Sequence, residues 1–143
     1  MLAAIRPNLE VTLYEATTKK CSFLAKAASC MEIKVAIRNI RLEDLSPETF
    51  DVVTARALAP LPKLLAYAYP FTGRRTVCLF LKGQSVGLEL TEAHKYWSMK
   101  TFCTASQTEP LAAIVTVKEL YPRNVALQKT SRPGRRQSKR RSR

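Results

Sequence analysis

Short strand-like segments alternate with helix-like segments along most of this sequence. Strand character comes from β-branched and aromatic runs or from alternating apolar side chains, and helix character from apolar side chains that recur every three or four residues. Strands are predicted at residues 10–15, 33–37, 50–57 and 76–81, and helices at 18–31, from 60 to Pro70, and at 88–96. This order favours right-handed βαβ units and a parallel sheet.

Two further strand-like runs follow at residues 97–104 and 112–120. Their connection is too short for a crossover helix, so we expect the last strand to pair antiparallel. The sequence therefore predicts an open α/β sheet, mostly parallel with an antiparallel last strand. Such sheets bind ligands beyond the carboxyl ends of their strands. The polar groups predicted at those ends are Glu15, a loop at 41–43, Arg56 and Lys82.

The size and composition exclude several classes of protein. The chain has 143 residues, enough for one domain with a substantial core but not for two. No apolar run approaches the roughly 20 residues of a membrane-spanning helix. The four cysteines have no CxxC spacing, and a single histidine cannot complete a Cys/His zinc site. We therefore expect no metal, no membrane contact and a reducing, cytoplasmic location.

Positive charge is concentrated at the C-terminus. The net charge is +13, but residues 121–143 hold nine basic side chains and no acid, which leaves +4 for residues 1–120. We expect a folded body over 1–120 and a disordered tail over 121–143, because residues 129–143 have no apolar side chain except Pro133. So many cations indicate an RNA partner, and a tail that serves only solubility is the alternative. The predicted RNA contacts in the tail are Arg132, Arg135, Arg136, Lys139, Arg140 and Arg141.

Three charged side chains at predicted strand ends are candidates for binding. Glu15 is an acceptor-only group suited to a ribose diol, although an acid at a helix N-terminus is also favoured by the helix dipole. Arg56 follows an apolar strand, where an arginine is costly unless it meets an anion; a structural pair with Asp44 or Asp51 is the alternative. Lys82 could meet RNA phosphate or serve as a simple strand-end cation.

Several segments in unbroken order carry a resemblance to a known family. They are Val11-Thr-Leu-Tyr-Glu15, Lys19-Lys20-x-x-Phe23-Leu24, Arg41-Leu-Glu43-Asp44, Phe50-Asp51-Val-Val-Thr-Ala-Arg56-Ala57 and Leu79-Phe-Leu-Lys82-Gly83. Over residues 1 to about 120 the chain resembles the ribosomal small-subunit RNA methyltransferase G family, once called glucose-inhibited division protein B. The resemblance implies a Rossmann-like sheet and transfer of a methyl group from S-adenosylmethionine to N7 of a guanosine in small-subunit (16S) ribosomal RNA.

The resemblance also implies roles for individual residues. Glu15 would hold the cofactor's ribose, with Ala16 and Thr17 lining the same turn, and the backbone of Leu42 and Glu43 would flank the adenine. The resemblance assigns Arg56 to the cofactor as well. Arg41, at the neighbouring strand end, is a predicted RNA contact together with Lys82.

The proposed chemistry needs no catalytic base. Guanine N7 carries a lone pair and no hydrogen, so catalysis consists mainly of aligning N7 with the reactive methyl group. We therefore predict no catalytic residue. His94, the only histidine, lies on a predicted helix and receives no role.

The chain departs from the family pattern at its start. The family carries a helical region, a first strand and a glycine-rich cofactor loop ahead of the matching part, and none of these is present among the 143 residues. We therefore expect an N-terminally truncated methyltransferase sheet with little activity of its own, and a monomer when complete. A non-catalytic RNA-binding module that retains the methyltransferase scaffold is the alternative.

Overall fold

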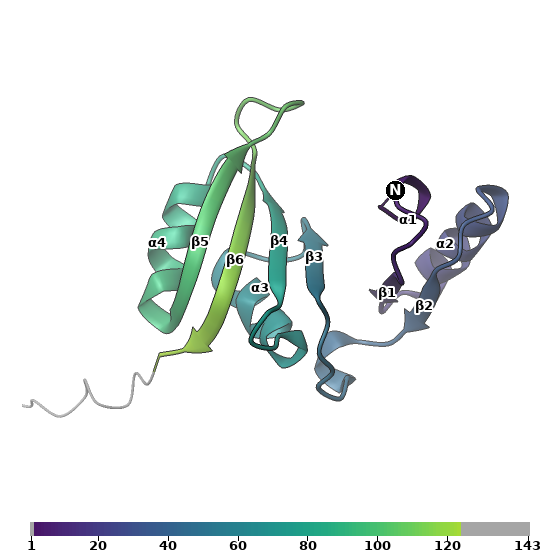
Figure 1. Cartoon of the computed structure of the whole chain (residues 1–143), viewed down its shortest axis with the longest axis horizontal. Helices are drawn as coiled ribbons and strands as arrows, with labels where there is room; N and C mark the ends of the chain where they lie inside the picture. The colour runs from purple at the N-terminus through teal and green to yellow at the C-terminus, as the bar shows by residue number, and fades with distance from the viewer. Residues whose placement is uncertain (1, 124–143) are drawn as a thin grey trace, which may run out of the picture. The chain divides into compact units, whose positions relative to one another are not determined.

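The computed structural model describes residues 2–123, which divide into two compact units at the bond between Thr49 and Phe50. Each unit contains its own sheet, one of two strands and one of four (Figure 1). The predicted α/β class is confirmed. The strands nevertheless fall into two sheets rather than the single sheet that the alternation predicted.

The first unit is a small βαβ arrangement. It contains α1 (Leu2–Ile5), β1 (Thr12–Glu15), α2 (Thr18–Cys30), β2 (Ala36–Asn39) and a 3-10 turn, η1 (Leu42–Asp44). Strands β1 and β2 are parallel, and their register places Glu15 opposite Asn39. Both strands therefore end at the same edge, as a crossover helix between them requires.

Strand β2 begins later than predicted because the end of α2 uses the preceding residues. Glu32 adopts a left-handed conformation with φ 54°, and the Ile33 N–H donates to the carbonyl oxygen of Ala28 at 3.0 Å. This is the hydrogen-bonding pattern that terminates many helices, although glycine usually occupies the left-handed position. The strand predicted at 33–37 was therefore wrong at its start, and the observed strand runs over Ala36–Asn39.

The second unit contains a four-stranded sheet with helices. Its elements are β3 (Val52–Arg56), α3 (Leu61–Ala68), η2 (Tyr69–Phe71), β4 (Val77–Lys82), α4 (Val86–Tyr96), β5 (Trp97–Ala105) and β6 (Ala113–Pro122). The strand order is β3-β4-β6-β5. Strands β3 and β4 are parallel, and β6 is antiparallel to both of its neighbours, which confirms the antiparallel last strand.

The core of the second unit lies between α3, α4 and one face of the sheet. Leu61 and Leu65 on α3, and Phe80, Val115 and Val117 on β4 and β6, are each 0% exposed. Figure 1 shows both helices behind the same face of the sheet. This packing fixes the carboxyl ends of β3 and β4, where Arg56 and Lys82 lie.

The predicted body and tail meet close to the end of the described residues. Strand β6 extends to Pro122, two residues beyond the predicted boundary at 120. The tail residues assigned to RNA, from Arg132 to Arg141, lie outside residues 2–123, so their role stays a prediction. No helix of residues 2–123 has the length and apolar character needed to cross a membrane.

Candidate functional site

The ends of β1 and β2 are tied together by side-chain hydrogen bonds. The Asn39 side-chain amide donates to the backbone carbonyl of Glu15 at 3.0 Å, and its oxygen accepts from the Thr18 hydroxyl at 2.9 Å. The backbone N–H of Ile40 also donates to the Glu15 carbonyl, at 3.2 Å. Asn39 therefore fixes the turn that presents the Glu15 side chain.

The Glu15 carboxylate is oriented and ionised. Its Oε1 accepts the backbone N–H of Thr17 at 2.8 Å, and its Oε2 lies 3.6 Å from the Lys20 ammonium. The Thr17 hydrogen bond and the Lys20 charge hold the pKa of Glu15 below its usual value despite partial desolvation. The side chain keeps 26% of its surface exposed, so an incoming pair of hydroxyl groups has access to an acceptor-only group.

The other first-unit candidates lie near these strand ends. Thr17 precedes α2, and Leu42 and Glu43 form the start of η1, directly after the extended Arg41. Ala16, Arg41 and Glu43 are exposed, whereas Leu42 is half-buried. The sequence-predicted set from Glu15 to Glu43 thus falls within one unit.

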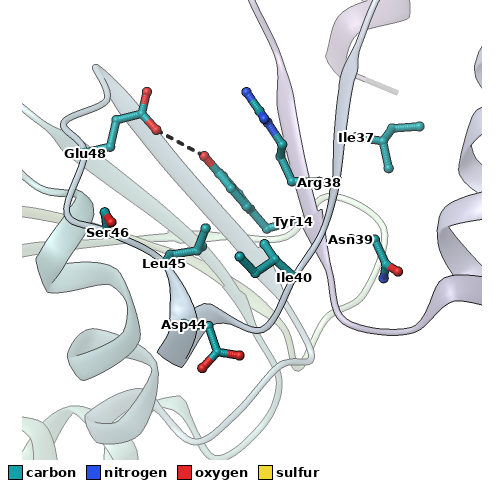
Figure 2. A pocket seen from close by; sticks show the side chains of 9 residues that line it. All are labelled: Tyr14, Ile37, Arg38, Asn39, Ile40, Asp44, Leu45, Ser46 and Glu48. Carbon is teal, nitrogen blue, oxygen red and sulfur yellow. Dashed lines mark hydrogen bonds between the residues drawn. The ribbon is translucent and has the colours of Figure 1, made fainter.

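A hollow of about 550 Å³ opens beside this edge (Figure 2). Its lining residues are Tyr14, Ile37, Arg38, Asn39, Ile40, Asp44, Leu45, Ser46 and Glu48. The Tyr14 hydroxyl donates to Glu48 at 3.4 Å, and burial together with the Glu48 charge raises the pKa of Tyr14. Asn39 and Ile40 line this hollow and also donate hydrogen bonds to the Glu15 carbonyl.

In the second unit, Arg56 ends β3 opposite Leu81 of β4. Its side chain is exposed, and within residues 50–123 it forms no ion pair with Asp51, which with Asp44 of the first unit was one of the two structural partners considered from the sequence. The next residue, Ala57, has φ 50°, an uncommon left-handed conformation for a residue with a side chain. Arg56 is thus presented by a sharp turn at the strand end.

Lys82 does not extend into solvent. Its side chain is 10% exposed, its ammonium lies 2.6 Å from Glu89 Oε2, and it donates to the Ala59 carbonyl at 2.9 Å. Burial would raise the pKa of Glu89, but hydrogen bonds from Lys82, Ser85 and the Leu61 N–H, together with the Lys82 charge, lower it below its usual value. The RNA contact predicted for Lys82 remains untested, and the observed partners are internal.

Sequence reasoning missed two residues of these networks, Asn39 and Glu89. Asn39 is a polar residue two positions after the second predicted strand, and a polar residue near a strand end is a signal for a binding site. Glu89 lies in the first turn of α4, where acids are favoured. Neither partner could be assigned, since Asn39 and Glu15 are 24 residues apart and Glu89 and Leu61 are 28 apart. Within residues 2–123, no cluster of His, Cys, Asp and Glu side chains could hold a metal ion.

Solved structures resemble the chain at the level of the fold. S-adenosylmethionine-dependent methyltransferase SibL in its apo form has a TM-score of 0.62 at 16% identity, with 82% of this chain and 45% of that chain covered. A methyltransferase from Pyrococcus furiosus has a TM-score of 0.60 at 15% identity, with 82% and 68% covered. These identities support a shared fold alone.

Two curated relatives share more sequence with the chain. Ribosomal RNA small subunit methyltransferase G of Zymomonas mobilis is 39% identical over 123 residues, which are 86% of this chain and 56% of that protein. The protein of the same name from Caulobacter vibrioides is 44% identical over 115 residues, 80% of this chain and 53% of that protein. The chain therefore spans little more than half the length of these relatives.

The family model described as rRNA small subunit methyltransferase G matches residues 1–116. This range contains Glu15, the Arg41–Glu43 segment, Arg56 and Lys82, and it confirms the resemblance on which their assignments rest. The chain belongs to the rRNA small subunit methyltransferase G family.

Proposed function

We propose that this protein serves in the S-adenosylmethionine-dependent methylation of small-subunit ribosomal RNA, at N7 of a guanosine. The observation that carries the proposal is the Glu15 carboxylate, which accepts the Thr17 N–H at the end of β1, where Asn39 holds the backbone carbonyl of Glu15, in a chain of this family. An ionised, acceptor-only group at such a strand end suits the ribose diol of a nucleoside cofactor.

The residues that we propose for the cofactor are those that the family resemblance implies. Glu15 binds the ribose hydroxyl groups, and Ala16 and Thr17 line the turn beside it. The backbone of Leu42 and Glu43 flanks the adenine. Arg56, exposed at the end of β3, supplies a cation for the cofactor. When bound, S-adenosylmethionine supplies an activated methyl group.

The chain's own contribution is to bind and orient. Guanine N7 carries a lone pair and no hydrogen, so no side chain would have to remove a proton before methyl transfer. We accordingly assign no catalytic residue, and half-buried His94 on α4 takes no part.

Basic side chains would bind the phosphate groups of the RNA. Arg41 is exposed beside the first-unit site, and residues 121–143 contain nine basic side chains without an acid. Such segments bind phosphate without sequence preference, while the folded part selects the base. We propose that the protein acts on ribosomal RNA in the cytoplasm and that it is a monomer.

Two measurements test this function: calorimetry for the binding of S-adenosylmethionine, and an assay of methyl transfer to small-subunit RNA. Both are done on the chain and on a chimera that adds the part of the Caulobacter vibrioides relative that the chain does not match. We expect methyl transfer from the chimera and little or none from the chain alone. Glu15→Gln should weaken cofactor binding by about tenfold or more, since hydrogen bonds to charged groups contribute that much.

The matched control is Glu10→Gln, which removes the same charge from an exposed residue ahead of β1. Equal affinities for the two variants would remove Glu15 from the cofactor site. RNA binding without any cofactor binding, in the chimera as well as the chain, would replace the proposal with a non-catalytic RNA-binding module.

A further inference from the structure

One ion pair of the second unit is far less exposed than the other pairs in residues 2–123. The side chains of Lys82 and Glu89 are 10% and 17% exposed. In the Lys95–Glu92 pair on the same helix, α4, the side chains are 59% and 45% exposed. Replacing a buried ion pair by apolar groups is often neutral or stabilising, so stability alone is a weak reason for one.

The partners of Lys82 and Glu89 lie on the two sides of Pro60. Lys82 donates to the carbonyl of Ala59 at 2.9 Å, and Glu89 Oε2 accepts the N–H of Leu61, the first residue of α3, at 2.6 Å. Proline has no N–H of its own. The pair therefore holds the backbone carbonyl before Pro60 and the backbone N–H after it.

The turn held in this way is the one that presents Arg56. Arg56 is fixed on one side by its pairing with Leu81 of β4, and the ion pair fixes Ala59 and Leu61. Between these anchors, Ala57 is in the left-handed region with φ 50°, a conformation that persists when its surroundings impose it. The conformation of the strand-to-helix turn thus depends on both anchors.

We infer that Lys82 and Glu89 are positioning residues, which latch the turn after β3 in the conformation in which Arg56 meets the cofactor. The inference rests on the cofactor-binding role proposed for Arg56. Neither residue has to touch the cofactor. Lys82 binds the Ala59 carbonyl on the inside of the turn. Glu89 pairs with Lys82 and accepts the Leu61 N–H, which links the turn to the start of α3.

The test compares Lys82→Met and Glu89→Gln with Glu92→Gln, a control on the same helix whose pair is exposed. Amide hydrogen exchange and 1H–15N spectra of the full chain report on the turn directly. We expect exchange at the Leu61 amide to speed up by about tenfold or more in both latch variants, because local opening follows the loss of its anchor. The Arg56 and Ala57 amide signals should shift, and the control should leave all of them unchanged.

Two further variants separate positioning from folding. Lys82→Arg keeps a cation and should restore most of the Leu61 protection. The double variant Lys82→Met with Glu89→Leu removes both charges, so its stability should recover while the shifted Arg56 signal remains. Unchanged Leu61 exchange and unchanged Arg56 signals in the single variants would overturn the latch.

Titration of the same chimera with S-adenosylmethionine separates the latch from the proposed function. We expect about tenfold weaker binding in Lys82→Met and Glu89→Gln, with affinity regained in Lys82→Arg. Weakened protection without a change in affinity would overturn the positioning role. A parent chimera that does not bind the cofactor would overturn the proposed function, and the exchange data would then decide the latch alone.

Discussion

Thr76 is a polar side chain buried in the second unit, at 5% exposure, and replacing it tests how the second sheet is held together. Its hydroxyl donates to the Phe50 carbonyl at 2.6 Å and accepts the Gly73 N–H at 2.8 Å. These bonds join the residues just before β3 and β4, so they help to set the register that brings Arg56 opposite Leu81.

Thr76→Val keeps the shape of the side chain and removes both hydrogen bonds. At about 0.5–1.5 kcal/mol for each bond, the free energy of unfolding should fall by about 1–3 kcal/mol. Thr76→Ser keeps both bonds and loses one methyl group, for which about 0.8 kcal/mol is expected. The hydrogen-bonding loss therefore makes the valine variant the less stable of the two.

Urea unfolding followed by tryptophan fluorescence measures this difference. Trp97 is the sole tryptophan of the sequence, and it is packed in the core of the second unit with 8% exposure, so its signal reports this unit. The change in free energy follows from the shift in midpoint at constant slope. A valine variant at least as stable as the serine variant would show that the two bonds do not hold the start of the sheet.

Three other predictions concern binding and chemistry. Arg56→Ala should weaken S-adenosylmethionine binding more than Arg41→Ala does, and both should exceed His94→Ala; equal effects of Arg56→Ala and His94→Ala in a titration would remove Arg56 from the site. Deleting residues 129–143 should flatten the dependence of RNA affinity on salt by several units of slope, at about 0.7 for each phosphate that is no longer neutralised; identical slopes would make these residues a solvated appendage. Burial raises the pKa of Cys78 to about 11, so at pH 8 its thiol stays protonated and should react with iodoacetamide only after unfolding, whereas the exposed Cys30 and Cys103 should react in the native chain; rapid labelling of Cys78 itself in the native chain, located by peptide mapping, would contradict its burial.

Local patterns predicted elements well and partners poorly. Helix α3 was expected to end at Pro70, and it ends at Ala68 with a 3-10 turn following. The expectation was close because proline has no N–H to donate to the helix and disfavours helical backbone in the residue before it. The inward course of Lys82 was not foreseen, since it depends on Glu89 and on the Ala59 carbonyl 23 residues earlier. The position of β6 between β4 and β5 was likewise beyond reach, because pairing across a sheet leaves no mark in the periodicity of one strand.

Because β6 lies between β4 and β5, the four-stranded sheet cannot be completed during synthesis until β6 has been made. Among the described strands β5 pairs only with β6, yet it leaves the ribosome first. At about 5–20 residues per second, β5 waits on the order of a second for its partner. During that interval β4 also lacks one neighbour, so the sheet of the second unit is completed only when β6 pairs with both β4 and β5. Premature termination before Ala113 would leave the edges of β4 and β5 that β6 covers unpaired.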